Sequence, residues 1–205
     1  YNMKRIFFSL ALLLAVTTLA AQTNMTAREA AVKIADRILA STTYEFKNTK
    51  TGETYKSVKK LPLDMNVKVA CKYNNWHYTN GVTNMALMEL GDKLADKKYE
   101  KYVLKNMNFV FNEGNLEFFR KQYDEAFKQD GWNAVRKLSW HMIFRGKRLD
   151  DNGPMGASLI ELQMRYPNQS FLDYVNETAE HLNYGEPRLV DGTIARIWPH
   201  VNTIW

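Results

Sequence analysis

Two short segments contain residue types that together could act on a sugar. Trp76-His-Tyr78-Thr-Asn80-Gly81 supplies aromatic rings and an amide, whereas Arg148-Leu-Asp150-Asp151-Asn152-Gly153 supplies two adjacent carboxylates. Aromatic rings stack on the C–H faces of sugars, and carboxyl groups can donate and accept protons. The two segments therefore indicate a candidate carbohydrate site.

The same residue types also have structural interpretations. Asp150 and Asp151 could cap a helix beginning near Gly153, because acidic side chains favour helix N-termini. Trp76 and Tyr78 could be core or loop-anchoring aromatics instead of sugar platforms. Both interpretations stay open on the sequence alone.

An internal repeat predicts that the two segments are equivalent in space. Leu87-Met-Glu-Leu90 recurs as Leu159-Ile-Glu-Leu162, and the Tyr-Val pair at 102–103 recurs at 174–175, in each case 72 positions later. Asn80-Gly81 and Asn152-Gly153 have the same spacing. A recurring unit of about two helix hairpins is typical of helix pairs stacked around an axis or along a solenoid. This period is longer than that of the common helical repeats, so we expect an α/α toroid with both segments in turns on one face.

Hydrophobic periodicity predicts helices over most of the chain, and therefore an all-α fold. Thr26-Ala-Arg-Glu29 is typical of a capping box, and Asp96 is the expected N-cap of a helix buried along Tyr99, Tyr102, Val103, Met107 and Val110. Further helices are predicted from Gly81 to about Gly91 (apolar face Val82, Met85, Met88 and Leu90), from Asn115, and over 132–144, 153–165 and 168–182. Residues 41–60 are predicted as a loop, and 67–71 as a strand or a helix end.

Composition excludes several classes of protein. The chain has 205 residues, one cysteine and a formal charge of +6. A single cysteine excludes an intramolecular disulfide framework and a Cys-rich metal site, and Cys71 is expected to be a buried small hydrophobe. The basic residues are dispersed, which argues against a nucleic-acid partner. Glu177 and His181 have metal-ligand spacing without a third ligand, so no metal is expected.

The N-terminus has the pattern of a secretory signal peptide over residues 1–21. Met3-Lys4-Arg5 precedes the apolar run 6–16 and a small-residue cleavage site, and two residues precede the expected initiator Met3. Removing this segment lowers the surplus charge to about +4 and leaves residues 22–205, which we expect to be the N-terminal part of the toroid domain. No later run is long enough for a membrane anchor, so we expect a secreted or periplasmic protein.

In both segments the chain resembles the unsaturated rhamnogalacturonyl hydrolases, which are relatives of the unsaturated glucuronyl hydrolases. The resemblance also includes Pro187-Arg188, Asp191-Gly192, Trp198-Pro199-His200 and Trp205, and extends from about residue 26 to the end. It implies an (α/α)6 barrel, a toroid of six helix hairpins, with a pocket at one end. It further implies removal of a 4,5-unsaturated uronic acid from lyase-generated acidic oligosaccharides, pectic rhamnogalacturonan being favoured. The family uses neither a metal nor an organic cofactor.

The resemblance assigns roles to individual residues. Asp151 matches one family carboxylate through Asp151-x-Gly153, with Asp150 as the alternative, since both side chains cannot face the pocket equally. Trp76, Tyr78 and Asn80 belong to the motif that lines the pocket, and Trp205 matches a tryptophan that stacks on the unsaturated sugar. Arg188 and Arg196 could bind the substrate carboxylate or form ordinary ion pairs. His200 is a further candidate for substrate binding.

The chain also departs from the family. The principal acid/base Asp of the family follows the equivalent of Trp205 by two positions, and about six of roughly twelve barrel helices are visible. We therefore expect the N-terminal half of a longer enzyme, inactive in isolation. Two other functions stay open: a non-catalytic helical-repeat module that binds carbohydrate or protein, and a polysaccharide lyase on a similar toroid.

Overall fold

The computed structural model describes residues 25–144, 149–197 and 202–204. The chain divides into two compact units, residues 1–37 and 38–205. Helix α2 (Ala27–Ser41) contains their boundary. At its start the Thr26 backbone N–H donates to the Glu29 carboxylate at 2.9 Å, and the Glu29 N–H donates to the Thr26 hydroxyl at 3.2 Å. This confirms the predicted capping box. The predicted signal peptide lies outside the described residues.

The predicted loop over 41–60 was wrong, because a small sheet begins there. Strands β1 (Phe46–Asn48), β2 (Thr54–Tyr55) and β3 (Val67–Val69) form an antiparallel sheet in the order β2-β1-β3. Phe46 pairs with both Tyr55 and Val69. The 3-10 turn η1 (Val58–Lys60) follows β2. Strands of two or three residues are too short to show a period-2 pattern, which explains why the sequence did not reveal them.

Aromatic packing and one glutamine attach this sheet to helix α5. The ring of Phe46 lies 5.9 Å from those of Phe118 and Phe119. The buried Gln122 amide donates to the carbonyl oxygens of Val67 (2.9 Å) and Asp64 (2.7 Å). One buried side chain of α5 thus holds the start of β3 and the residues before it.

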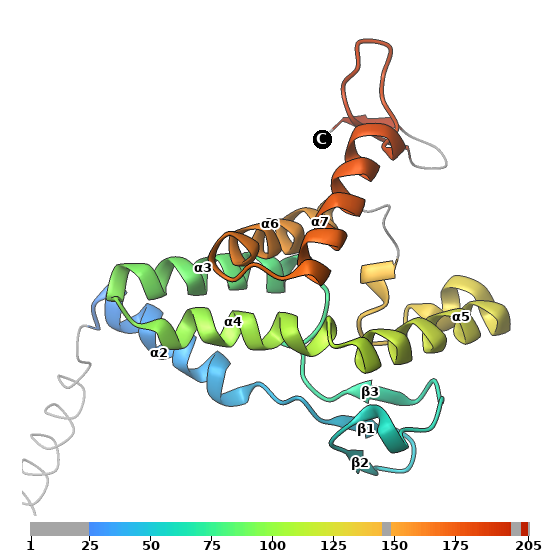
Figure 1. Ribbon diagram of the computed structural model, residues 1–205, viewed down its shortest axis with the longest axis horizontal. Coiled ribbons are helices and arrows are strands. Elements are labelled where there is room, and N and C mark those ends of the chain that lie inside the picture. Colours follow the sequence, from blue (N-terminus) through green and yellow to red (C-terminus); the bar gives the residue numbers. More distant parts are fainter. Residues whose placement is uncertain (1–24, 145–148, 198–201, 205) are drawn as a thin grey trace, which may run out of the picture. The chain divides into compact units, whose positions relative to one another are not determined.

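Helices α3 (Tyr78–Leu94) and α4 (Lys97–Val110) form the first helix hairpin (Figure 1). Asp96 caps α4 by accepting from the Lys98 N–H at 3.0 Å, as predicted. All five residues of the predicted apolar face of α4 are buried: Tyr99, Tyr102, Val103, Met107 and Val110. The pattern predicted α4 correctly because most of its buried face is apolar, although Glu100 and Asn106 are buried as well.

The predicted buried face of α3 was largely wrong. Val82 and Met85 are exposed, whereas the buried residues are Asn80, Gly81, Asn84, Leu87, Met88 and Gly91. The reason is that α3 packs closely against another helix, α6. A Cβ at Gly81 would lie 2.4 Å from the carbonyl carbon of Pro154, so only glycine fits there. Close helix approach thus selects small and polar residues that hydrophobic periodicity does not detect.

Helix α5 (Glu113–Val135) follows its N-cap Asn112 and begins two residues before the predicted start at Asn115. It is kinked at Asp130 and Gly131, where Gly131 has φ 52°. The predicted helix over 132–144 is therefore wrong: its first part continues α5 beyond the kink, and its last part is the 3-10 turn η2 (His141–Phe144). A positive φ favours glycine and interrupts the regular helix.

The second helix hairpin consists of α6 (Leu149–Arg165) and α7 (Gln169–Glu180). Asn168 caps α7, as the predicted start required, and a π-helical turn η3 (His181–Gly185) follows. Asn80-Gly81 and Asn152-Gly153 lie inside the first turns of α3 and α6, so the prediction of turns at these positions was wrong. Strands β4 (Ala195–Ile197) and β5 (Asn202–Ile204) pair in a C-terminal hairpin.

The repeat predicted from the sequence corresponds to the two hairpins. Leu87 and Leu159 are both buried, as are Tyr99 and Phe171, and each pair is 72 positions apart. Helix α3 packs on α4 and on α6, and α6 packs on α7 (Figure 1). The structure is mostly helical with few short strands, which confirms the all-α class.

Candidate functional site

The N-terminal ends of α3 and α6 meet through Trp76 and Asn152. The Trp76 indole N–H donates to the Asn152 side-chain oxygen at 2.9 Å, and both side chains are buried. The Tyr174 hydroxyl donates to the same oxygen at 3.4 Å, and its ring lies 5.0 Å from that of Trp76. The two sequence segments that supply the candidate site are thus joined directly, one from each hairpin.

Trp76 has no open ring face on which a sugar could stack. It is 1% exposed and is packed among Phe111, Trp140 and Tyr174. The structure therefore matches the core interpretation of this residue. Its function in the site is to hold the two helix ends together.

Tyr78 and Asn80 differ in what they offer to a ligand. Tyr78 is 46% exposed, and its ring lies 4.7 Å from that of His77, which caps α3 by accepting from the Thr79 N–H. The Asn80 amide donates to the carbonyl oxygens of Lys72 (2.9 Å) and Asn75 (2.8 Å) and is buried. Tyr78 can reach a ligand, whereas Asn80 shapes the segment before α3.

The remaining predicted residues lie in two places. Asp150 and Asp151 are in the first turn of α6, close in sequence to Asn152, and the structure describes their backbone alone. Helix α6 begins four residues before the predicted start at Gly153, so both acids lie inside the helix and not ahead of it. An acid in the first turn still stabilises the helix dipole, and the position also suits a carboxylate at the shared helix end. Arg188 donates to the carbonyl oxygens of Gly192 and Leu182 at 2.9 Å, which ties its guanidinium to the C-terminal segment. Arg196 belongs to β4, without a described side chain, while His200 and Trp205 lie outside the described residues.

Cys71 is half-buried rather than fully buried. Its sulfur lies 3.7 Å from the carbonyl oxygen of Ser41. The expectation of a buried small hydrophobe is therefore met only in part.

A pocket of about 430 Å³ lies elsewhere, between α5, η2 and α7. Its polar lining includes Arg120, Asp173, Glu177 and His181, none of which was predicted for the sugar site. The Arg120 guanidinium lies 4.1 Å from the ring centre of Phe144, and the His181 ring contacts the Glu186 carboxylate at 3.1 Å. Burial raises the pKa of Tyr174, which also lines the pocket and keeps its proton at neutral pH. The spacing of Asp173, Glu177 and His181 on one face of a helix was the sequence signal for this cluster.

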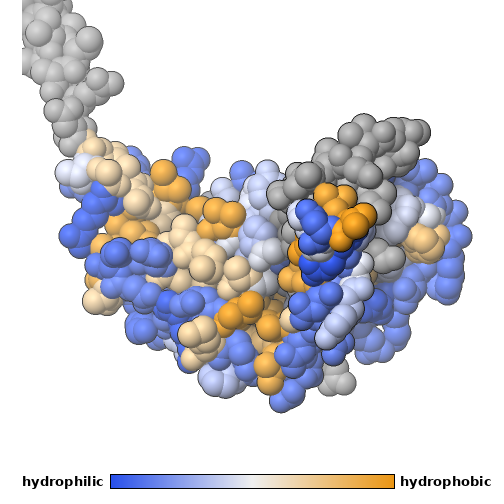
Figure 2. Space-filling model, turned by 90° about the horizontal axis from the view of Figure 1, so that it is seen from above, coloured by the Kyte–Doolittle hydropathy of each residue, from blue (hydrophilic) through white to orange (hydrophobic). Residues whose placement is uncertain are grey.

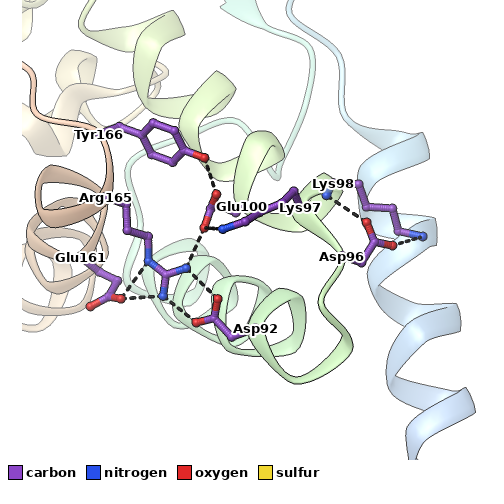
Figure 3. A network of polar contacts seen from close by, with 8 residues as sticks. All are labelled: Asp92, Asp96, Lys97, Lys98, Glu100, Glu161, Arg165 and Tyr166. Carbon is purple, nitrogen blue, oxygen red and sulfur yellow. Dashed lines mark hydrogen bonds and ion pairs between the residues drawn. The ribbon is translucent and has the colours of Figure 1, made fainter.

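A polar network connects the C-terminal ends of α3 and α6 with the first turn of α4 (Figure 3). Arg165 binds the carboxylates of Asp92 (2.7 Å), Glu100 (2.8 Å) and Glu161 (2.6 Å). The Tyr166 hydroxyl also donates to Glu100. This hydrogen bond, assisted by Arg165 and Lys97, lowers the pKa of Glu100 despite its burial. The sequence signal was the Glu161–Arg165 spacing, which Glu89 and Lys93 repeat in α3.

Within residues 25–144, 149–197 and 202–204, no three His, Cys, Asp or Glu residues are grouped so as to hold a metal ion. None of the helices in these ranges is both long and apolar enough to cross a membrane. Neither a protein-family model nor a curated protein matches the chain.

Proposed function

We propose that this chain forms about the first half of an (α/α)6 barrel that hydrolyses unsaturated uronyl oligosaccharides. The observation that supports the proposal is the hydrogen bond from Trp76 to Asn152, which joins the aromatic segment and the two-aspartate segment at one helix end. Two hairpins related by a 72-residue repeat are also the unit from which such a barrel would be built.

The reaction proposed from the family resemblance is hydration of a C4=C5 double bond. The principal carboxyl group, expected two positions after Trp205, gives a proton to C4, and the oxygen of a water molecule bonds to C5. The proton lost by that water returns to the carboxylate, and the resulting hemiketal opens to release the next sugar. Asp151, or Asp150 in its place, is the second carboxylate at the site.

The substrate is an acidic oligosaccharide, and the exposed Tyr78 is the aromatic residue best placed to contact it. Arg196 is the remaining candidate for the uronate carboxylate, because Arg188 donates to backbone carbonyls instead. A rhamnogalacturonan fragment is the favoured substrate on the resemblance alone. The proposed location is outside the cell or in the periplasm.

The first test is to sequence the encoding DNA beyond the codon for Trp205. An Asp codon two positions on, followed by further helical repeats, would support the enzyme. A stop codon there in an intact gene would favour a binding module instead.

The complete protein is then incubated with an unsaturated rhamnogalacturonan disaccharide while the ultraviolet absorbance of the double bond is recorded. A hydrolase removes the absorbance, whereas a lyase acting on the intact polysaccharide increases it. Asp151→Asn and Asp150→Asn should separate the catalytic carboxylate from the structural one. Asp124→Asn, at an exposed position on α5, is the matched control and should retain full activity. An unchanged absorbance with the wild-type protein would contradict the proposal.

A further inference from the structure

The pocket between α5, η2 and α7 contains charged groups of both signs that are not paired with each other. The Arg120 guanidinium comes from α5, and the carboxylates of Asp173 and Glu177 come from α7. In the described part of the chain, no hydrogen bond or ion pair engages the Arg120 guanidinium or the Glu177 carboxylate. Hydrophobic residues are scattered among hydrophilic ones on the face of the molecule that Figure 2 shows, so an exposed apolar side chain does not by itself mark a site. Unpaired charges in a pocket of about 430 Å³ are a better indicator of a ligand.

The first hairpin shows what this side of α7 can hold, because the equivalent side of α4 is occupied by Tyr44. The Tyr44 hydroxyl donates to the Asn106 side-chain oxygen at 2.6 Å, and the Lys105 ammonium lies 4.3 Å from the centre of the Tyr44 ring. The Phe109 ring lies 5.5 Å from the same ring. Three residues that line the pocket are the equivalents of these, 72 positions later: Glu177 for Lys105, Thr178 for Asn106 and His181 for Phe109. A six-membered ring with a hydroxyl group therefore fits against this side of the hairpin.

The two hairpins differ in charge at this place, which changes the kind of ring that the second one can accept. Lys105 places a cation over the face of the Tyr44 ring, which is an attractive contact. Glu177 provides a carboxylate at the equivalent position, and the face of an aromatic ring is itself negative. A sugar ring suits a carboxylate better, because its hydroxyl groups donate hydrogen bonds to the charged oxygens.

We propose that this pocket binds a uronic acid residue of an acidic oligosaccharide. The Arg120 guanidinium lies 4.1 Å from the ring centre of Phe144, and stacking on that ring leaves its planar fork of N–H groups able to hold the carboxylate of the sugar. Glu177 and Asp173 accept from the ring hydroxyls on the other side of the pocket. The ligand thus bridges opposite charges that the chain itself leaves apart.

The side of α7 that lines the pocket is not the side on which a further hairpin would pack. In the first hairpin, Glu100 of α4 binds Arg165 of the second, and the equivalent of Glu100 on α7 is Leu172. Successive residues of a helix are about 100° apart, so Leu172 lies roughly opposite Tyr174 and His181, which line the pocket. A third hairpin of the proposed barrel would therefore meet α7 on the side away from the pocket.

Tyr174 connects the pocket to the candidate site. Its side chain lines the pocket, and its hydroxyl donates to Asn152 at the shared helix end. The pocket uses residues other than those predicted for the sugar site, so it is a second place for an acidic sugar beside the first. Binding there does not require that the protein hydrolyses anything.

Titration of the complete protein with D-galacturonic acid and with D-galactose, followed by saturation-transfer NMR, tests the proposal. The two sugars share their ring and differ only at C6, where galacturonic acid has a carboxylate. Galacturonic acid should bind, and galactose should bind at least tenfold more weakly, because it offers no carboxylate to Arg120. Absence of saturation transfer to galacturonic acid, or equal affinity for the two sugars, would overturn the proposal.

Variants locate the bound sugar. Arg120→Met should weaken binding of galacturonic acid to the level of galactose, and Glu177→Ala should weaken binding of both sugars at least tenfold. Glu180→Ala, at an exposed position of α7 outside the pocket, is the matched control and should bind as the wild type does. Arg120 and Glu177 are exposed as well, so these variants should fold, which circular dichroism verifies.

The remaining outcomes separate this pocket from the candidate site. Unchanged binding in Arg120→Met or Glu177→Ala would overturn the proposal, as would loss of binding in Asp151→Asn while Glu177→Ala binds normally. Binding that follows the pocket variants in a protein that leaves the absorbance of the unsaturated disaccharide unchanged would support the pocket and contradict the hydrolase.

Discussion

At the scale of single residues, the two hairpins offer pairs of equivalent positions with different surroundings. Gly81 and Gly153 are 72 positions apart, and only Gly81 faces another backbone. Arg165 and Lys93 are likewise equivalent, and only Arg165 reaches a buried carboxylate. In each pair the same substitution can be made at both positions, so the variant at the less buried position is the control for the variant at the buried one.

Gly81→Ala should destabilise the protein by about 1–3 kcal/mol, because the new methyl group would collide with the backbone of Pro154. That backbone cannot move aside as a flexible side chain would. Gly153→Ala meets open space and replaces a helical glycine, so it should raise stability by up to ~1 kcal/mol. Urea unfolding followed by circular dichroism measures both. Equal effects of the two substitutions would contradict the close α3–α6 contact.

Arg165→Met should lower the free energy of unfolding by about 3 kcal/mol, since it leaves the buried Glu100 carboxylate without its arginine. Lys93→Met removes an exposed pair with Glu89 and should change stability by less than ~0.5 kcal/mol. Comparison of the two variants in urea separates a buried ion pair from a surface one.

The loss in Arg165→Met should depend on pH. Because the pKa of Glu100 is lowered in the folded protein, its charge stabilises the fold above the ordinary value of 4.5, and this contribution is lost as the pH falls through the lowered pKa. The difference between wild type and Arg165→Met should therefore shrink below about pH 4.5. A difference that stays constant between pH 7 and pH 3 would argue against an ionised Glu100.

At the scale of helices, the repeat extends to the caps. Asp96 caps α4 and Asn168 caps α7, again 72 positions apart, and each accepts from the N–H two residues later. Asp96→Ala and Asn168→Ala should each cost about 1 kcal/mol. Asp96→Asn should be nearly neutral, because asparagine performs the same function in α7. Thermal unfolding of the three variants tests this, and a large cost of Asp96→Asn would show that the charge matters beyond the cap.

The helices also show which parts of the fold can be predicted from sequence. The pattern predicted α4 because apolar and aromatic residues make up most of its buried face, with Glu100 and Asn106 as the polar exceptions. It failed for α3, where close packing requires Gly81 and buries Asn84. The sheet was missed because its strands have at most three residues. Periodicity thus predicts faces that bury apolar area and misses contacts determined by backbone approach.

For the candidate site, the sequence predicted where the two segments lie but not which of their side chains are buried. The spacing correctly predicted that the segments of Trp76 and Asn152 are equivalent, and the structure joins them. Residue type alone did not predict that Trp76 is buried and that Asn80 binds backbone carbonyls. An aromatic or amide side chain serves equally well in a core or in a site, so its exposure has to come from the fold.

At the scale of the whole molecule, Trp76 connects more elements than its position before α3 indicates. It hydrogen-bonds to α6 through Asn152, and its ring contacts Tyr174 of α7 and Phe111 at the end of α4. It also lies 6.4 Å from the ring of Trp140, which precedes η2. Loss of this one side chain should therefore affect both hairpins together.

Trp76→Phe keeps most of the ring but removes the N–H, so the buried Asn152 oxygen retains only the longer bond from Tyr174. The expected cost is about 1–3 kcal/mol, the usual result of leaving a buried acceptor poorly paired. Trp132→Phe, at a 40% exposed position on α5, should cost less than ~1 kcal/mol. Urea unfolding by circular dichroism compares the two. If both substitutions cost the same, the Trp76–Asn152 bond does not join the hairpins energetically, and the main structural support for a shared site at their ends is lost.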